Sequence, residues 1–321
     1  MNWQPGTELA TLQARAKLNA YIRHFFAQRN VLEVETPLLA TAGVTDPHLV
    51  NFSTDMLLPG GQSAQKLYLQ TSPEYAMKRL LCAGSGSIYQ ICKAFRNEEQ
   101  GRFHNPEFTM LEWYREGFDH WQLMQEMQDL LHPLFESGKF QQLSYQQAFQ
   151  QFLNFDPLAD CDKTLATACI AHGFDNFATL DTPRDTQLQL LFSHVIEPQI
   201  AQETPCFIYH FPASQAALAK ISPQDSRVAE RFELYYKGFE LANGFHELSS
   251  PEEQTERFAQ DNAQRRDMGI AEAQHDERFL AALKQGLPDC AGVALGLDRV
   301  LMLLQDKQDI DEVISFSIRR A

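Results

Sequence analysis

The chain has 321 residues, and its 27 lysines and arginines against 42 aspartates and glutamates give a formal net charge of −15. This length allows one large domain or two ordinary ones, and the 44% hydrophobic fraction is that of a globular protein. A broad nucleic-acid-binding surface is normally basic, so the acidic balance argues against one and leaves open only a local basic patch.

The six cysteines form no CxxC pair and no zinc-like spacing, and most lie in apolar runs, so we expect reduced thiols. The N-terminus lacks a basic segment followed by an apolar one, which a secretory signal needs. No run approaches the roughly 18 apolar residues of a membrane helix. We therefore expect a soluble, cytoplasmic protein with no membrane partner.

The first third of the chain predicts a mixture of helices and strands. Helical spacing of apolar residues predicts a helix over 9–30, and VLEVETPLL (31–39) predicts a short strand that stops at Pro37. TSPEYAMKRLLCAG (71–84) predicts a helix that starts near Ser72 and Pro73 and ends at Gly84. Two strands follow, SIYQICKAFRNE (87–98) and PEFTMLEWYRE (106–116), as an antiparallel hairpin around a polar loop.

The remainder predicts helices first and strands later. Residues 119–204 are mostly helical, with the best helices at 121–135 and 185–200. Strands are predicted at 205–212 and, as a pair, over 231–248, followed by a helix capped by Ser250 and a final apolar helix after the small residues of CAGVALG (290–296). Without repeats, linkers or βαβ alternation, the pattern favours an α+β fold with an antiparallel sheet flanked by helices. We expect a single domain over 1–321 with a helical insertion at about 119–204.

The predicted hairpin has charged and aromatic residues at positions of one parity. Arg96 and Glu98 on the first strand share a face, as do Phe108, Glu112 and Tyr114 on the second. An arginine can bind phosphate or carboxylate, a phenylalanine can stack on a base, and the glutamate and tyrosine can hold an ammonium. The face is therefore either a site for a nucleotide beside an amino acid, or a solvated surface with cross-strand salt bridges.

Two further clusters carry chemistry. Glu240 and Glu247 flank an Asn-Gly pair, and carboxylates beside phosphate suit Mg²⁺, although Glu240 taken alone is more typical of a surface carboxylate. Gly296 is followed by Asp298 and Arg299 at the start of an apolar helix. This third cluster is either a closely packed strand-to-helix corner with a surface arginine or a place where a nucleotide approaches the backbone.

Together these segments resemble the catalytic core of class II aminoacyl-tRNA synthetases, most closely lysyl-tRNA synthetase. VLEVETPLL resembles the first, dimer-forming motif of that family, FRNEEQGRFHNPEFTMLEWY (95–114) the second, and GVALGLDRVLML (292–303) the third. LYLQTSPEYAMKRL (67–80) and FELANGFHEL (239–248) extend the likeness to the lysine enzyme, so the resemblance covers nearly the whole chain. It implies a homodimeric ligase that uses ATP and Mg²⁺ to form an aminoacyl-adenylate.

The resemblance also implies roles for individual residues. The catalytic residues would be Arg96, Glu240 and Arg299. ATP would be bound by Arg96, Asn97, Glu98, His104, Asn105, Phe108, Glu240, Leu241, Gly296 and Arg299. The amino acid would be bound by Ser72, Pro73, Glu74, Glu112, Tyr114, Glu247 and Ala294, and the metal by Glu240 and Glu247.

Three departures from lysyl-tRNA synthetase change the expected substrates. That enzyme carries an OB-fold anticodon-binding domain ahead of its core, whereas here the first motif follows a single predicted helix, so we expect no anticodon-binding domain and no tRNA aminoacylation. Ser72 stands where the lysine enzyme usually has alanine, and Ala294 where it usually has glycine. The added hydroxyl and methyl should reshape the amine-binding end, and a methyl alone shifts discrimination by about 1–3 kcal/mol.

A free-standing core with these changes resembles the family of ligases that adenylate (R)-β-lysine and transfer it to the ε-amine of a lysine on elongation factor P, a protein shaped like tRNA. The resemblance implies (R)-β-lysine and elongation factor P as partners. The alternatives are another amide-forming paralogue that passes its adenylate to ammonia or a free amine, a non-catalytic lysine-binding regulator, and genuine tRNA aminoacylation. The presence of Arg96, Glu240 and Arg299 argues against the regulator.

Overall fold

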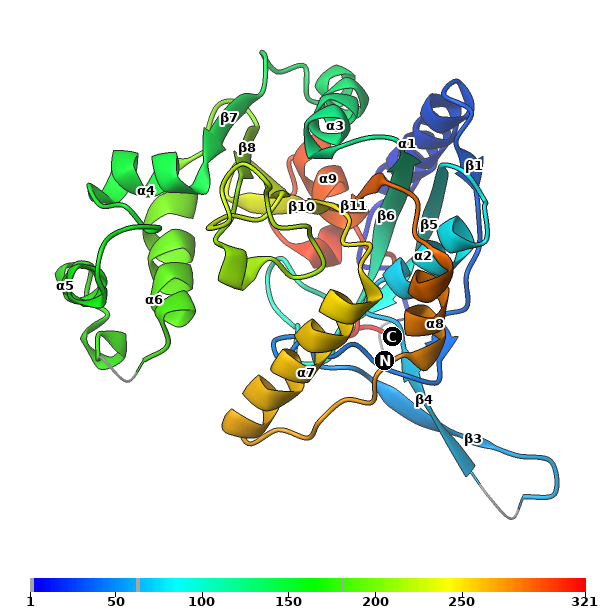
Figure 1. Cartoon of the computed structure of the whole chain (residues 1–321). Helices are drawn as coiled ribbons and strands as arrows, with labels where there is room; N and C mark the ends of the chain where they lie inside the picture. The colour runs from blue at the N-terminus through cyan, green and yellow to red at the C-terminus, as the bar shows by residue number, and fades with distance from the viewer. Residues whose placement is uncertain (1–2, 62–63, 180–181) are drawn as a thin grey trace. The chain divides into compact units, whose positions relative to one another are not determined.

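The computed structural model describes residues 3–61, 64–179 and 182–321, and the chain falls into two compact units, Met1–Gly117 with Leu248–Ala321 and Phe118–Glu247 (Figure 1). The described part of the first unit contains α1 (Leu9–Ala27), β1 (Leu32–Glu33), β2 (Leu39–Ala40), β3 (Ser53–Leu57), β4 (Ala64–Leu69), α2 (Glu74–Cys82), β5 (Ile88–Phe95), β6 (Glu107–Glu116), α7 (Pro251–Asp267), α8 (Glu277–Gln285), β11 (Cys290–Gly296), α9 (Leu297–Leu304) and the 3₁₀ turn η5 (Ile310–Glu312). The second contains α3 (His120–Phe135), β7 (Gln141–Ser144), α4 (Tyr145–Leu153), α5 (Asp162–Ala171), η1 (Asp175–Phe177), α6 (Arg184–Leu191), η2 (Phe192–Ile196), η3 (Glu197–Gln199), β8 (Cys206–Tyr209), η4 (Ala213–Gln215), β9 (Arg231–Tyr236) and β10 (Phe239–His246).

The sheet of the first unit runs in the order β1-β5-β6-β11, with β1 parallel to β5 and the other pairs antiparallel. The predicted hairpin is confirmed: β5 and β6 pair without interruption from Ile88 opposite Tyr114 to Phe95 opposite Glu107. The strand predicted over 31–39 is much shorter, because pairing ends at Glu33, well before Pro37.

One side of this sheet is covered by α1. The Phe26 ring stacks on Tyr89 of β5 with ring centroids 4.4 Å apart and meets Trp113 of β6 at 5.5 Å. Tyr89 and Trp113 are register partners and so share a face. Because side chains alternate along a strand, Glu112 and Tyr114 both lie on the opposite face of the sheet, away from α1.

A second sheet of the first unit, β2-β4-β3, was missed by the sequence analysis, as was α8. All five residues of β3 are exposed, so the strand has no alternation of buried and exposed positions from which it could be recognised. The helix predicted after residue 250 is confirmed as α7, with the Ser250 hydroxyl accepting a hydrogen bond from the Glu253 amide.

The sheet of the second unit runs in the order β10-β9-β8-β7. The predicted strand pair is confirmed as β9 and β10, joined at Lys237 and Gly238, which both have positive φ, the backbone of a two-residue hairpin turn. The strand β7, parallel to β8, lies inside the region expected to be mostly helical. The helix predicted at 185–200 begins as α6 and widens into the π-turn η2, which precedes Pro198, a residue without an N–H for the helix ladder.

The core of the second unit is aromatic. Tyr145 of α4 stacks on Phe192 with centroids 5.3 Å apart, and both rings contact Phe211. Phe149 and Tyr235 complete the cluster and connect α4 to β9. These rings hold α4 and η2 against β9, the strand that pairs with β10.

Candidate active site

The centre of the candidate site in the first unit is a row of residues across β5, β6 and β11. Glu112 is paired in register with Gln90 on one side and with Ala294 on the other, so the three side chains share one face. Tyr114 lies two residues along β6 and donates a hydrogen bond from its hydroxyl to Glu112 Oε1 at 2.7 Å. Glu112 is only 2% exposed. The structure thus places the methyl of Ala294 directly beside a buried carboxylate that a phenol helps to orient.

The polar loop after β5 carries an arginine beside an aromatic ring. The guanidinium carbon of Arg96 lies 5.2 Å from the ring centroid of Phe108, and Arg96 Nη1 lies 3.6 Å from Glu99 Oε1. Arg96 Nε is buried and has no hydrogen-bond partner among the residues that the structure describes. A buried donor without a partner is uncommon, and an anion at this position would satisfy it.

Arg96 and Glu98 do not lie on the first hairpin strand, as the sequence analysis assumed. β5 ends at Phe95, and Glu98 has a φ of 66°, in the left-handed region that breaks the alternation of a strand. The loop is held instead by backbone bonds from the Arg96 amide to Pro106 and from the Asn97 amide to Val50. The face predicted for Phe108, Glu112 and Tyr114 therefore includes Arg96, which lies over the Phe108 ring, and the alternation is lost only at Glu98.

Three more residues expected at the nucleotide lie in or near this loop. Arg299 Nη2 is 2.7 Å from His104 Nε2, and because a guanidinium can only donate, Nε2 is the acceptor. Asn105 is buried, and its amide donates to Glu107 O at 2.6 Å and accepts from the Ile318 amide at 3.0 Å. One amide hydrogen and one oxygen lone pair of Asn105 remain for a ligand.

The position of Arg299 depends on the neighbouring Asp298. Asp298 is buried in the first turn of α9 and accepts hydrogen bonds from Arg15 Nη2 at 2.5 Å and from the Thr109 amide at 2.6 Å. The carboxylate therefore connects α1, β6 and α9 at the residue before Arg299. Arg15 was missed by the sequence analysis, because nothing local in a helix predicts a partner 283 positions away.

The start of α2 positions Ser72, Pro73 and Glu74. The Ser72 hydroxyl accepts a hydrogen bond from the Glu74 amide at 3.3 Å, and Pro73 is the residue before the first turn. Glu74 Oε1 lies 2.6 Å from the ammonium of Lys78, which is fully buried. Lys78 was also missed, although its spacing of four residues from Glu74 is the spacing at which helical ion pairs form.

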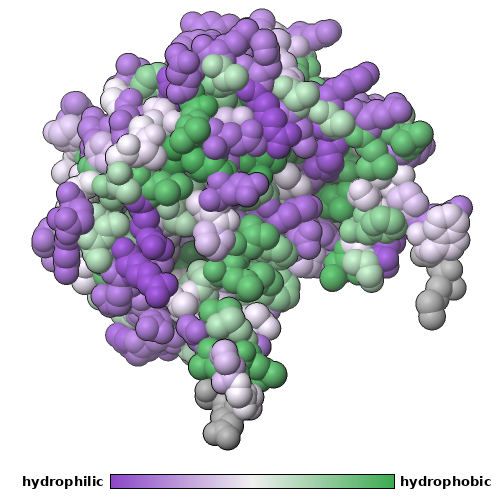
Figure 2. Space-filling model, turned by 90° about the vertical axis from the view of Figure 1, so that its right-hand side faces the viewer, coloured by the Kyte–Doolittle hydropathy of each residue, from purple (hydrophilic) through white to green (hydrophobic). Residues whose placement is uncertain are grey.

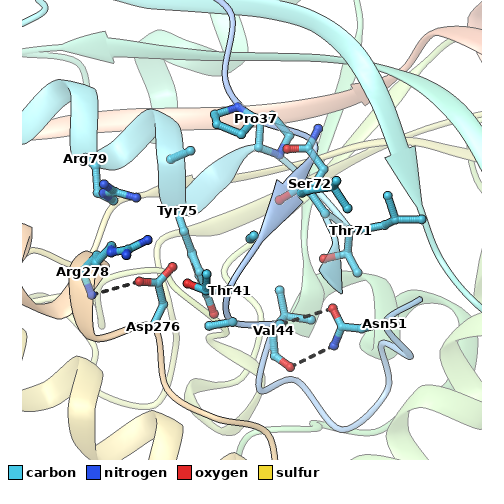
Figure 3. Close-up of a pocket in the computed structure, with 18 residues that line it drawn as sticks. Pro37, Thr41, Val44, Asn51, Thr71, Ser72, Tyr75, Arg79, Asp276 and Arg278 are labelled. Atoms are coloured by element: carbon cyan, nitrogen blue, oxygen red, sulfur yellow. Dashed lines mark hydrogen bonds between the residues drawn. The ribbon is translucent and has the colours of Figure 1, made fainter. Parts of the chain in front are cut away.

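Ser72 and Pro73 line a cavity of about 160 Å³, drawn in Figure 3. Its wall also includes Asn51, which is hydrogen-bonded to both backbone groups of Val44, and Asp276 at the start of α8. Glu112, Tyr114 and Ala294 are not among the lining residues. The structure thus brings Glu112, Tyr114 and Ala294 together in one group and Ser72 and Pro73 in another.

The three other residues expected in the site belong to the second unit. Glu240 and Leu241 lie on β10, where Glu240 is paired with Tyr235. Glu247 follows the strand, is 1% exposed and forms a β-bridge with Ala219. Burial, reinforced by the charge of Glu240 and opposed by Arg231, raises the pKa of the neighbouring Glu233. Glu240 thus lies close enough to Glu233 to affect its pKa, while Glu233 is itself paired with Arg231 and Tyr235.

Comparison with known proteins agrees with this architecture. The family model for tRNA synthetases class II (D, K and N) matches residues 6–320. The elongation factor P–(R)-β-lysine ligase of Vibrio atlanticus (strain LGP32) is 54% identical over 319 residues, covering 99% of each chain. The enzymes of the same name from Pseudoalteromonas translucida (strain TAC 125) and Vibrio parahaemolyticus serotype O3:K6 (strain RIMD 2210633) are 55% and 56% identical, over 99% and 98% of this chain and 98% of each relative. The chain therefore belongs to the class II (D, K and N) tRNA synthetase family, and within it to the family of the elongation factor P–(R)-β-lysine ligases.

Proposed function

We propose that this protein is a ligase that activates (R)-β-lysine with ATP as an aminoacyl-adenylate and transfers it to the ε-amine of a lysine on elongation factor P. The relatives that carry this activity in their name match the chain from end to end. The observation that carries the proposal is the row in which Ala294 lies beside the buried pair of Glu112 and Tyr114. This row supplies an ammonium-binding carboxylate with a methyl that narrows the space around it.

For ATP, the residues present fit the nucleotide. Arg96 would hold the α-phosphate and the substrate carboxylate, and its buried Nε without a partner in the described chain supports an anion there. Phe108 and Arg299 would enclose the adenine. The other proposed contacts with ATP come from Asn97, Glu98, His104, Asn105, Glu240, Leu241 and Gly296.

For Mg²⁺, we assign Glu240 and Glu247, because this ion binds to one or two carboxylates together with phosphate oxygens. When bound, the ion neutralises charge on the phosphates. The reaction itself is in-line attack of the amino-acid carboxylate on the α-phosphorus, with pyrophosphate leaving, and needs no protein nucleophile. The catalytic residues Arg96, Glu240 and Arg299 would therefore act through position and charge.

For the amino acid, Glu247 and Tyr114 would recognise the side-chain ammonium, and Glu74 and Glu112 would face the other amine. Ser72, Pro73 and Ala294 would shape this end of the pocket. The Lys78 ammonium already neutralises part of the charge of Glu74. (R)-β-Lysine has one amine displaced by one carbon relative to α-lysine, which is the kind of difference that a hydroxyl and a methyl at this end can select.

We further propose a homodimer, a single catalytic domain over 1–321, a cytoplasmic location and no tRNA aminoacylation. Exposed leucines in the segment that resembles the dimer motif and in the β2-β4-β3 sheet support the dimer: Leu32 is 56% exposed, Leu39 45% and Leu57 72%. Figure 2 shows hydrophobic patches between hydrophilic residues on one face of the molecule. All six cysteines are free thiols, as reduced cytoplasmic proteins have, and every helix that the structure describes is too short or too polar to cross a membrane.

The proposal is tested by incubating the chain with ATP, (R)-β-lysine and purified elongation factor P and measuring the intact mass of the acceptor. We expect the addition of one β-lysyl residue on a lysine side chain, located by peptide mapping. Arg96→Gln should lower the rate about 10²- to 10³-fold. The matched control is Arg102→Gln in the same loop, because the Arg102 guanidinium is engaged by Gln308, and it should stay near the wild-type rate. Labelling of ammonia or tRNA instead of the protein would contradict the proposal.

A further inference from the structure

A cluster of two histidines and a glutamate in the second unit takes no part in the proposed reaction. His120 begins α3, Glu230 immediately precedes β9, and His246 ends β10. One nitrogen of each ring and one carboxylate oxygen all lie within 4.8 Å of one another. His120 and Glu230 are buried, with 2% and 8% of their surfaces exposed. Three potential metal ligands thus converge from three segments of one unit.

His120 is the least explained member of the cluster. Both of its ring nitrogens are buried, and neither has a hydrogen-bond partner among the residues described. Burial, assisted by the nearby His210, lowers the pKa of His120 to about 3, so the ring is neutral. Buried polar groups in proteins are nearly always paired, and a neutral imidazole offers the lone pair that metal ions bind. The ring is therefore in the right form for a ligand, and its nitrogens have no hydrogen-bond partner within the described chain.

The other two members share a proton. His246 Nδ1 lies 2.5 Å from Glu230 Oε2, and His246 Nε2 lies 3.1 Å from Lys220 Nζ. Because an ammonium can only donate, Nε2 accepts from Lys220, and Nδ1 must carry the ring proton that it donates to Glu230. A cation placed between Nδ1 and the carboxylate would replace this proton.

We propose that His120, Glu230 and His246 bind a divalent transition-metal ion of the Zn²⁺ type. Two imidazoles and one carboxylate form a donor set that binds Zn²⁺ with one position left for water, whereas Mg²⁺ prefers oxygen ligands alone. Tetrahedral ligands at about 2.0–2.2 Å from Zn²⁺ lie roughly 3.4 Å apart, so rotations of the present side chains suffice to close the site.

Binding needs only a change of tautomer at His246. The ring proton moves from Nδ1 to Nε2, the ion bonds to Nδ1 in its place, and the Lys220 ammonium gives up its hydrogen bond to Nε2. The ion then connects the start of α3 with the segment before β9 and the end of β10. Because His246 is the residue before Glu247, the ion fixes the end of β10 from which Glu247 follows.

The site is tested on the full chain after removal of metals with a chelator, by titration with Co²⁺. We expect visible d–d absorption that saturates at one equivalent, disappears when Zn²⁺ is added and survives an excess of Mg²⁺. Saturating Zn²⁺ should also raise the Tm by several degrees, because it binds only the folded form. Absence of the Co²⁺ bands, or their displacement by Mg²⁺, would overturn the proposal.

Variants distinguish metal binding at this site from metal binding by surface histidines. His120→Phe should abolish the Co²⁺ bands and the Zn²⁺-dependent rise in Tm, while the metal-free Tm stays close to wild type because His120 has no hydrogen bond to lose within the described chain. Glu230→Gln should weaken Co²⁺ binding at least tenfold and serves if His120→Phe does not fold. The control His172→Gln changes an exposed histidine of the same unit and should retain both signals. Retention of both signals in His120→Phe and in Glu230→Gln would refute the assignment.

Discussion

Replacement of Asp298 by asparagine tests whether one buried carboxylate holds the first unit together at the proposed nucleotide site. The side chain keeps its shape, but one of the two donors that face it, Arg15 Nη2 at 2.5 Å or the Thr109 amide at 2.6 Å, then meets an NH₂ group. The lost charge-assisted bond is worth about 1.5–3 kcal/mol, and the stranded donor adds about 1–3 kcal/mol. With Asp298 only 2% exposed, we expect a loss of about 3–5 kcal/mol in the free energy of unfolding.

Urea unfolding followed by tryptophan fluorescence, with Trp3 and Trp121 replaced by Phe so that the signal comes from Trp113, measures this loss within the first unit, because Trp113 is fully buried in β6. The matched control is Glu272→Gln, which removes the carboxylate of an exposed ion pair with Arg266 and should cost less than about 1 kcal/mol. A double-mutant cycle with Arg15→Met should return a coupling energy of about 1–3 kcal/mol. The reasoning is refuted if Asp298→Asn unfolds at the same urea concentration as the control.

Three further predictions address specificity, packing and thiol chemistry. Ala294→Gly removes the methyl beside the proposed ammonium-binding row of Glu112 and Tyr114. It should move the ratio of kcat/KM for (R)-β-lysine over α-lysine roughly 10- to 200-fold toward α-lysine, and an unchanged ratio would count against the pocket assignment. Gly244→Ala places a Cβ 2.4 Å from the ring of Phe232, so it should lower stability by about 1–3 kcal/mol in thermal unfolding. Wild-type stability would show that β9 and β10 can separate at no cost. At pH 8, iodoacetamide should modify Cys161 well before Cys206, as followed by peptide mass spectrometry. A hydrogen bond from the Thr164 amide lowers the pKa of the exposed Cys161 thiol and so raises its thiolate fraction, whereas burial raises the pKa of the Cys206 thiol to about 12. Equal rates for the two thiols would contradict this assignment.

The hairpin of β5 and β6 was predictable because its signals are local. Alternating apolar residues, a polar loop and β-forming side chains lie next to one another in sequence, and the register then follows from the length of the loop. The same is true of the turn at Lys237 and Gly238 and of the cap at Ser250. In each case the residues that decide the structure are within a few positions of the structure they decide.

The position of Glu98 could not be predicted in this way. A single left-handed residue at Glu98 ends the alternation, and such a backbone at a non-glycine residue leaves no mark in the composition of the loop. Long-range pairs could not be predicted from the sequence either, because the bond between Arg15 and Asp298 joins two helices from opposite ends of the chain. Local patterns predicted the elements of the site, while tertiary contacts decide how its charged residues are held.

ATP–pyrophosphate exchange without any acceptor shows whether this chain activates (R)-β-lysine. Exchange is measured in parallel with α-lysine and (R)-β-lysine, with Arg96→Gln as the inactive control and Arg102→Gln as the active one. We predict rapid exchange with a strong preference for (R)-β-lysine, because Ala294 narrows the space beside Glu112 and Tyr114. Exchange with neither amino acid would contradict the proposed adenylation.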